Sequence, residues 1–296
     1  MSFMLLGILN SQASGGKKMI FVGVTEDGKI STSEDGITWT SQTPGLGSVF
    51  ISSATGGSGD YVVVGRTGLL ATSPEGVTWT SRTSGFGSGN INSVSFGDGI
   101  YLAAGDSGTI IASTNTTSWS SRTTGFGVNN IQAVTFGNNL YLAAGSSGKL
   151  STSTDTTTWT SRTSQFGTTR IRGLTYGDSL YVAVGESGKI STSTNGSSWT
   201  SRSSPWAGPL YSVAYGDGVY VIGGSEGNLI SSSDGTTWTS RTSGFGASEI
   251  LSVTYGAGLF VAAGWSGKLR TSPDGTTWTE RFPGFGTSEI NGVTFG

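Results

Sequence analysis

Arginine and carboxylate side chains are the residues of this sequence that could do chemistry, and most of them recur at fixed intervals. The chain has no cysteine and no histidine, so the usual zinc ligands and the commonest general base are missing. One column recurs about every 40 residues: Arg82, Arg122, Arg162, Arg202, Arg241 and Arg281, with Gln42 in the seventh copy. Arginines repeated in every unit point in as many directions as there are units, whereas a catalytic set converges on one centre. We expect this column to form hydrogen bonds or stem packing between neighbouring repeats.

The carboxylates do not suggest a catalytic pair either. Glycoside hydrolysis needs two carboxyl groups close together with different pKa values. Most acidic residues here belong to turns, and Glu26, Asp106, Glu186 and Glu226 belong to different repeats although they could face one surface. No nucleophile elbow, phosphate loop or metal-ligand spacing is present. We therefore expect a protein that is not an enzyme and that uses no metal and no cofactor.

Composition excludes several further classes of protein. Charged residues make up 11% of the 296 residues and the net charge is −2, so no basic stripe is available to neutralise a nucleic-acid backbone. No stretch approaches the roughly 20 apolar residues of a membrane span. The 50 glycines could suggest disorder, but aromatic residues (10%) recur in register, which disordered chains lack. Many tight turns between short strands explain the glycine content better.

Seven tryptophans mark the repeat that must position these residues. They are Trp39, Trp79, Trp119, Trp159, Trp199, Trp238 and Trp278, separated by 40, 40, 40, 40, 39 and 40 residues. Each ends the same phrase, of which Ser-Pro-Asp-Gly-Thr-Thr-Trp is one copy. A period near 40 residues indicates one supersecondary unit used seven times.

One copy of the repeat reads as four short strands. Residues 91–96 alternate apolar and polar, residues 100–104 form a continuous apolar run, and residues 109–113 and 119–122 follow after polar turns. Residues 123–130 then cross to the next copy. Four strands in 40 residues is the size of a β-propeller blade, and no helical periodicity is found.

The two ends of the repeat array predict a closed ring. Residues 19–24 correspond to the second strand of a blade, and residues 290–295 correspond to a first strand. We predict an all-β, seven-bladed β-propeller of four-stranded blades over residues 18–296, closed by the C-terminal strand pairing into the N-terminal blade. Such closure removes exposed sheet edges. An open array of the same units is the alternative.

The repeated phrase Ser-x-(Asp/Asn/Glu)-x-x-(Thr/Ser)-Trp resembles the Asp-box of sialidase-type and photosystem-assembly-factor-type propellers. In these folds the box joins the third and fourth strands on the side away from the binding surface. The resemblance therefore implies scaffold roles for Asp35, Asn115, Asp155, Asn195, Asp234 and Asp274, which can accept backbone N–H bonds within the turn. The sialidase branch would also imply an arginine triad and a Tyr–Glu nucleophile pair, which the repeated arginine column does not match.

The wording Trp-Thr-Ser-Arg-Thr-Ser-Gly-Phe-Gly and the opening of the chain also look like bacteriophage tail-associated virion proteins. This resemblance implies a virion structural protein, and we expect a tail adhesin that binds host surface glycan or protein. One alternative is a decoration or connector that binds only other virion proteins. Another is a secreted or assembly-factor-type propeller of a bacterium, in an extracellular or periplasmic location.

Candidate binding residues are those at which one copy departs from the others. In a propeller, the loop between the second and third strands shares a face with the crossover between blades. The loop position varies as Glu26, Arg66, Asp106, Ser146, Glu186, Ser225 and Trp265, and the crossovers vary at Arg170 and Trp206. Trp206 either fills a slot held by Phe in other copies or joins Trp265 in binding a glycan or protein. We take Trp206, Trp265, Arg66, Asp106, Glu186 and Arg170 as candidate ligand-binding residues.

Residues 1–17 form a second candidate interface. They lie outside the repeat and are apolar at Phe3, Met4, Leu5, Leu6, Ile8 and Leu9. No basic residue precedes this apolar run, as one would in a secretory signal, so we expect the segment to be retained. We predict that it docks on a neighbouring chain, with other virion proteins as partners and without membrane insertion.

Overall fold

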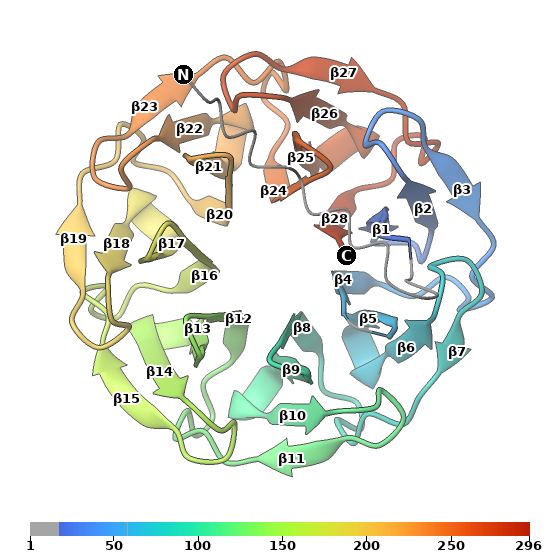
Figure 1. Cartoon of the computed structure of the whole chain (residues 1–296), viewed down its shortest axis with the longest axis horizontal. Coiled ribbons are helices and arrows are strands. Elements are labelled where there is room, and N and C mark those ends of the chain that lie inside the picture. Colours follow the sequence, from blue (N-terminus) through green and yellow to red (C-terminus); the bar gives the residue numbers. More distant parts are fainter. Residues whose placement is uncertain (1–17, 58) are drawn as a thin grey trace, which may run out of the picture.

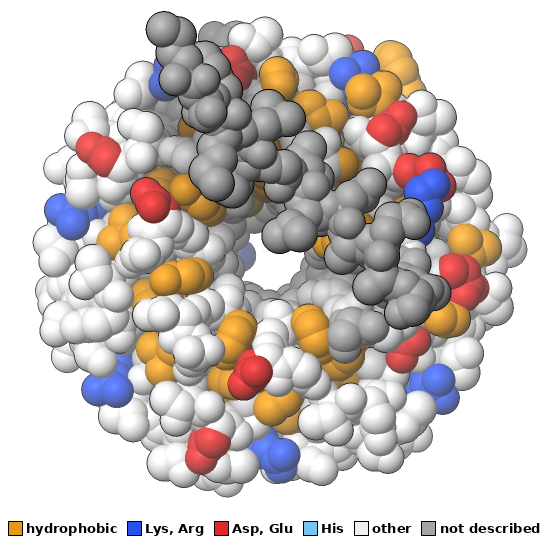
Figure 2. All heavy atoms as spheres, in the orientation of Figure 1, with side chains coloured by type: hydrophobic (Ala, Val, Ile, Leu, Met, Phe, Trp, Pro, Cys, Tyr) orange, Lys and Arg blue, Asp and Glu red, His pale blue; other side chains and the backbone are white. Residues whose placement is uncertain are grey.

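The chain folds into a ring of blades around a central opening. The computed structural model describes residues 18–57 and 59–296, and over these residues 28 strands form seven four-stranded antiparallel sheets. Figure 1 shows the sheets arranged radially, and Figure 2 shows the opening between them. The predicted all-β, seven-bladed propeller with four-stranded blades is therefore confirmed.

In each blade the second strand is almost entirely buried, whereas the innermost strand is buried only in part. The innermost strands are β28 (Ile290–Phe295), β4 (Ile51–Gly56), β8 (Ile91–Gly97), β12 (Ile131–Gly137), β16 (Ile171–Gly177), β20 (Leu210–Gly216) and β24 (Ile250–Gly256). The second strands are β1 (Phe21–Thr25), β5 (Tyr61–Gly65), β9 (Ile100–Gly105), β13 (Leu140–Gly145), β17 (Leu180–Gly185), β21 (Val219–Gly224) and β25 (Leu259–Gly264). Second strands are apolar because both of their faces are covered by neighbouring blades.

The two outer strands are shorter and become polar toward the rim. The third strands are β2 (Ile30–Ser33), β6 (Leu70–Ser73), β10 (Ile110–Ser113), β14 (Lys149–Ser153), β18 (Ile190–Ser193), β22 (Leu229–Ser232) and β26 (Leu269–Ser272). The fourth strands are β3 (Thr40–Gln42), β7 (Thr80–Ser81), β11 (Ser120–Arg122), β15 (Thr160–Thr163), β19 (Thr200–Arg202), β23 (Thr239–Arg241) and β27 (Thr279–Arg281). Short, polar outer strands make poor templates for pairing with another chain.

The C-terminal strand closes the ring as predicted. β28 pairs antiparallel with β1, with Phe21 opposite Phe295 and Val22 opposite Thr294. The backbones of Ile20 and Gly296 also exchange hydrogen bonds of 3.0 and 3.1 Å. Blade A therefore consists of β28, β1, β2 and β3, and blades B to G follow in chain order.

Tyrosines supply some of the hydrogen bonds between blades, and the repeated arginines supply none that the described residues show. The Tyr141 hydroxyl donates to the carbonyl of Gly97 at 2.8 Å, and the Tyr181 hydroxyl donates to that of Gly137 at 2.5 Å. Each of these bonds joins a second strand to the end of the innermost strand of the preceding blade. Burial raises the pKa of both tyrosines to about 12, so they remain neutral donors.

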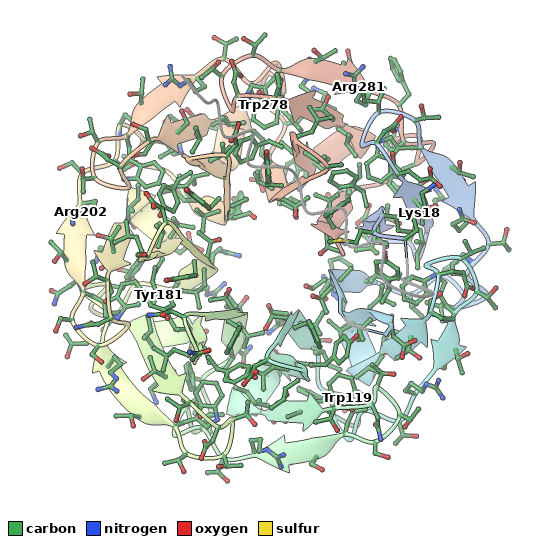
Figure 3. All side chains as sticks on the ribbon, in the orientation of Figure 1. Lys18, Trp119, Tyr181, Arg202, Trp278 and Arg281 are labelled. Atoms are coloured by element: carbon green, nitrogen blue, oxygen red, sulfur yellow. The ribbon has the colours of Figure 1, made fainter. Side chains whose placement is uncertain are left out.

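The arginine column acts within each blade, which corrects the expectation of blade-to-blade contacts. Arg162 Nε donates to Thr152 Oγ1 at 2.9 Å, and Arg202 Nε donates to Thr192 Oγ1 at 2.8 Å. Each bond ties the fourth strand to the third strand of the same sheet. Figure 3 shows Arg202 and Arg281 at the outer rim, far from the central opening. The column is thus part of the scaffold.

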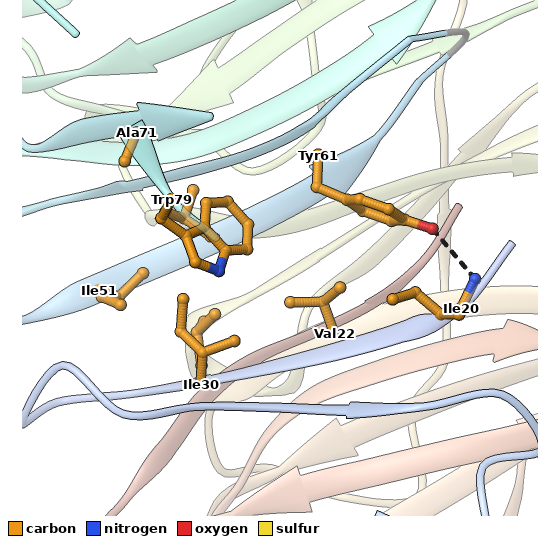
Figure 4. Packing of buried hydrophobic residues seen from close by; sticks show 9 residues of the cluster. Ile20, Val22, Ile30, Ile51, Tyr61, Ala71 and Trp79 are labelled. Carbon is orange, nitrogen blue, oxygen red and sulfur yellow. Dashed lines mark hydrogen bonds between the residues drawn. The ribbon is translucent and has the colours of Figure 1, made fainter. Parts of the chain in front are cut away.

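The hydrophobic core is divided into clusters that fill the spaces between adjacent blades. In the cluster of Figure 4, Val22 and Ile30 of blade A pack against Ile51, Tyr61 and Trp79 of blade B. The Ile20 amide donates to the Tyr61 hydroxyl at 3.1 Å across the same seam. Burying one such aliphatic or aromatic side chain contributes about 1.5–3 kcal/mol. The packing between blades is therefore the main source of stability.

The Asp-box residues make the turn contacts expected of a scaffold. Asp155 Oδ1 accepts the backbone N–H groups of Thr157 and Thr158, both at 2.8 Å. Trp159 Nε1 donates to the Thr156 carbonyl at 2.9 Å, which fixes the indole under the turn. The same pattern recurs at Asp35 and Asn195. The turn joins the third and fourth strands, as the resemblance implies.

Candidate binding site at the channel mouth

A repeated backbone hydrogen bond brings two loops of each blade together on one face. The first residue after the second strand donates its N–H to the carbonyl of the residue that precedes the innermost strand. Examples are Arg66 to Phe50 at 3.0 Å, Asp106 to Asn90 at 2.9 Å, Glu186 to Arg170 at 3.0 Å and Trp265 to Glu249 at 3.0 Å. Both loops therefore sit at the rim of the central opening, which we call the channel mouth.

The loop after the second strand is a tight 3₁₀ turn that needs glycine at its third position. These turns are η1 (Arg66–Gly68), η2 (Asp106–Gly108), η3 (Ser146–Gly148), η4 (Glu186–Gly188), η5 (Ser225–Gly227) and η6 (Trp265–Gly267). Gly108 has φ +65°, and a Cβ there would lie 2.6 Å from the carbonyl oxygen of Gly127. Glycine is required by both constraints. The first turn residue has neither constraint, so it can vary from blade to blade.

One residue of each innermost strand forms a ring around the channel. This ring consists of Ser52, Asn92, Gln132, Arg172, Tyr211, Leu251 and Asn291. It lines both a cavity of about 530 Å³ at the mouth and a deeper cavity of about 170 Å³. The preceding residue, such as Ile91 or Ile131, is buried between blades. The blade thus fixes the backbone of the ring residue, while the type of side chain at this position can differ from blade to blade.

Arg172 is the centre of an ionic network on one side of the mouth. Its guanidinium donates to the Glu186 carboxylate from Nε at 2.8 Å and forms an ion pair from Nη2 at 2.5 Å. The guanidinium carbon also lies 5.2 Å from the centre of the Tyr211 ring. Burial, followed by the negative charge of Glu249, raises the pKa of Tyr211 to about 12. The Tyr211 hydroxyl therefore stays neutral beside the Glu249 carboxylate.

A second cation–aromatic pair lies in blade B. The Arg66 guanidinium carbon is 3.8 Å from the centre of the Phe50 ring, and both residues line the mouth. Burial, followed by the negative charges of Glu26 and Glu249, raises the pKa of Glu289, whereas Arg66 lowers it. Glu26, Glu249 and Glu289 therefore face one arc of the rim, with Arg66 near its end.

Amide side chains occupy the intervening part of the mouth. Asn92 Nδ2 donates to the Ile131 carbonyl at 2.9 Å, and Asn291 Nδ2 donates to the Ile51 carbonyl at 3.0 Å. Each asparagine is thus anchored to the next blade. Asp106 accepts the Asn90 N–H at 3.0 Å, which fixes its carboxylate at the rim. Anchored amides and carboxylates of this kind can pair with the N–H and C=O groups of a bound polypeptide.

The structure brings some of the candidate residues from the sequence together at the mouth. Arg66 and Asp106 line the mouth, and Glu186 forms an ion pair with Arg172, which also lines it. Arg170 precedes β16 on the same rim and is exposed. Trp265 lies on η6 with 40% of its surface exposed. The docking residues Phe3, Met4, Leu5, Leu6, Ile8 and Leu9 lie outside the described residues.

Trp206 occupies the position that Phe holds in other copies. It packs against the cluster that contains Val184 and Leu210, and its Nε1 donates to Ser225 Oγ at 3.3 Å. It borders a separate cavity of about 380 Å³ that also contacts Arg202. The geometry therefore favours the interpretation that Trp206 fills the position that Phe occupies in other copies, over the interpretation that it binds a ligand.

Sequence reasoning missed the ring itself and the neighbouring residues Phe50 and Glu249. A signal for the ring was present, because the residue after the isoleucine or leucine that begins each first strand is different in nearly every copy. Alternation along the strand shows that this residue faces away from its buried neighbour. It does not show that all seven such residues face one channel.

The described part of the chain shows neither a metal site nor a membrane span. Over residues 18–57 and 59–296, no group of three or more His, Cys, Asp or Glu side chains could hold a metal ion. No helix within those ranges is long and apolar enough to cross a membrane.

Solved structures with this fold differ widely in what they are. A structure of YCF48 bound to D1 peptide has a TM-score of 0.66 at 18% identity, with 95% of each chain covered. The computationally designed Ika8 protein has a TM-score of 0.69 at 14% identity, covering 94% of this chain and 88% of that chain. Virginiamycin B lyase from Staphylococcus aureus has a TM-score of 0.66 at 12% identity, covering 83% and 91%. At such identities these likenesses show the fold alone.

Family membership comes from the sequence. No curated protein matches the chain. The family model of the DUF6242 beta propeller domain matches residues 73–207 and 168–295, which together cover most of the chain. This protein therefore belongs to the DUF6242 beta propeller domain family.

Proposed function

We propose that this protein is a non-catalytic binding propeller that holds a polypeptide segment of a partner protein at its channel mouth. The observation that carries this proposal is the ring of seven side chains of six different types, from Ser52 to Asn291, that lines the mouth. A purely structural position would be filled in nearly the same way in every blade, as the arginine column is in six of the seven. Variation at positions that line the mouth favours recognition.

The chemistry of the mouth suits a polypeptide better than an apolar small molecule. Its lining combines Arg66 and Arg172, Asp106 and Glu249, and several amides. Paired charges and amides match the alternating donors and acceptors of an extended backbone. Among the similar structures, YCF48 is bound to D1 peptide, which supports peptide binding as a use of this architecture.

The virion role expected from the sequence remains a prediction. The family description and the three similar structures named above do not refer to virion proteins. A propeller of the assembly-factor type, the third expectation from the sequence, agrees better with the YCF48 likeness. Its extracellular or periplasmic location also remains a prediction.

The experiment exploits residues that the fold already accepts at the same repeat position. Selection of peptide binders from a displayed random library would be followed by affinity measurements on the variant R172S/Y211S, which copies Ser52 of blade B. We expect a loss of about tenfold or more in affinity. R202Q, which copies Gln42 on the outer rim, is the matched control and should bind normally.

Failure of the library to yield binders, or equal binding by R172S/Y211S and wild type, would contradict the proposal. A glycan array screened in parallel tests the adhesin expectation. Glycan binding that R172S/Y211S abolishes would replace the polypeptide with a host glycan as the ligand of the mouth.

A further inference from the structure

Blade G differs from the other six blades at three surface positions. Trp265 stands where the others have small polar or charged residues, Phe282 where they have Thr or Ser, and Glu280 where they have Ser. Phe282 is 82% exposed and Trp265 is 40% exposed. Two aromatic departures from a polar repeat within one blade indicate a contact surface, because neither side chain is needed by the same position elsewhere.

Phe282 lines a groove of blade G, and the turn that carries Trp265 contributes its next two residues to the same groove. This groove, of about 370 Å³, is lined by Ser266, Lys268, Glu280, Phe282 and Pro283 among others. Trp265 directly precedes Ser266 in η6. The groove therefore lies between the turn that carries Trp265 and the segment after β27 that carries Phe282.

A residue of the third strand beside the groove also departs from the repeat in blade G. Arg270 replaces Ser, Ala or Ile of the other third strands. Its Nη2 lies 3.5 Å from Glu280 Oε2, and its guanidinium carbon is 6.0 Å from the centre of the Phe245 ring. Its Nε is buried without a hydrogen-bond acceptor among the described residues. Arg270 thus holds Glu280 beside the groove.

A backbone hydrogen bond links the turn beside the groove to the channel mouth. Trp265 N donates to the Glu249 carbonyl at 3.0 Å, and Glu249 lines the mouth. We call the path Glu249–Trp265–groove–Phe282 the blade G track. It runs outward from β24 toward β27, from the opening to the rim in Figure 1.

The two ends of the blade G track have different chemistry. Over residues 18–57 and 59–296, the Glu249 carboxylate has no Lys or Arg nitrogen within 4.0 Å, and the charges of Glu26 and Glu289 lie nearby. The inner end therefore attracts a cation. The outer end offers aromatic surface at Trp265 and Phe282, which suits apolar or aromatic side chains.

We infer that an extended segment of the partner polypeptide leaves the mouth across blade G, with a basic side chain at Glu249 and apolar side chains against Trp265 and Phe282. This inference rests on the proposed function and adds the direction and the residue classes of the bound segment. A strand-like segment fits, because its side chains alternate and can reach separate positions along a straight track.

The test again uses residues from the repeat itself. The variant W265S/F282T gives blade G the residues that blade D has at these positions, Ser146 and Thr163, so the fold accommodates them. V128T is the matched control: Val128 is 89% exposed on a crossover, and other copies have Thr168 or Thr287 there. Affinities of the library-selected peptides are measured for wild type and all variants.

We expect W265S/F282T to lose about tenfold or more in affinity, and V128T to bind like wild type. Selected peptides should carry Lys or Arg near apolar residues, and E249N, which copies Asn90, should weaken the preference for the basic residue. Peptides that respond to R172S/Y211S but not to W265S/F282T would overturn the blade G track and leave the proposed function intact. Peptides that respond to neither would overturn both.

Discussion

At the scale of single residues, the ring repeats one hydrogen bond that blade C lacks. In most blades the fourth-strand arginine donates from Nε to a hydroxyl on the third strand, as Arg82 does to Thr72 Oγ1 at 2.9 Å. Blade C has Ala112 in place of that threonine. Arg122 Nε is accordingly buried without a hydrogen-bond partner among the described residues. Comparison of the repeats thus identifies an unpaired hydrogen-bond donor, Arg122 Nε, and the substitution at Ala112 that would give it an acceptor.

Replacing Ala112 with threonine should stabilise the protein. The new hydroxyl would accept the Arg122 Nε–H, and we expect the free energy of unfolding to rise by about 1 kcal/mol. Urea denaturation followed by tryptophan fluorescence measures the change. The reciprocal variant T152A should lower stability because it leaves Arg162 in the state that Arg122 now has. An unchanged or lower midpoint for A112T would contradict this account of the column.

At the scale of elements, the box turns link stability to pH. Hydrogen bonds, led by the Thr158 backbone N–H, hold the pKa of Asp155 well below its usual range, and turn hydrogen bonds have the same effect on Asp234 and Asp274. Asn115 and Asn195 make the same turn without a titrating group. The chain therefore contains its own non-titrating reference.

Acid should weaken the protein through these turns. A carboxylate with a folded-state pKa below its unfolded value of about 3.9 contributes stability that is fully present above that value and is lost as pH falls through the folded pKa. Urea midpoints should therefore decline below about pH 4. The variant D155N/D234N/D274N should decline less steeply over that interval. Parallel pH profiles for the variant and wild type would refute the link.

Strand order, strand limits and the box turns were predictable because the residue pattern that indicates each of them occurs in seven copies of the repeat. Residues 91–96 and 100–104 were expected as strands, and the structure has Ile91–Gly97 and Ile100–Gly105. Contacts between copies were less predictable. The sequence of a repeated residue such as Arg162 does not indicate whether its hydrogen-bond partner lies in its own blade or in the next one. The prediction that the arginines bond to a neighbouring blade was therefore wrong.

The candidate site was predictable only in part. Comparison of the copies pointed to the face that carries the channel mouth and to Arg66 and Asp106, which line it, because loops that share a propeller face follow from the topology. Arg172, Tyr211 and Glu249 were missed because their convergence depends on the radius and tilt of the inner strands. Those quantities follow from blade packing, which the sequence pattern does not display.

At the scale of the whole molecule, ring closure makes stability a collective property. β28 joins β1, and its residues Ile290 and Val293 pack with Phe21 and Phe285 in one buried cluster. Every blade therefore has two neighbours. The last strand contributes to both blade A and the seam with blade G.

Removal of residues 290–296 should open the ring. The edge of β1 would be exposed, and we expect self-association and a less cooperative unfolding transition because edge strands pair with other chains. Size-exclusion chromatography and urea denaturation provide the measurements. A synthetic peptide of residues 287–296 should restore the wild-type behaviour, whereas a scrambled peptide should not. A truncated protein that stays monomeric with an unchanged midpoint would show that closure is dispensable.

The seven ring positions from Ser52 to Asn291 each belong to a different sheet, and each side chain is carried by its own sheet. Well-separated substitutions on independent supports tend to combine additively. Ring residues that do not contact one another can therefore be altered one at a time, whereas the effects of changing Arg172 and Tyr211, which lie beside each other, are coupled. The binding specificity of this architecture then depends on the combination of seven side chains, and changing that combination requires little change in the sheets that carry them.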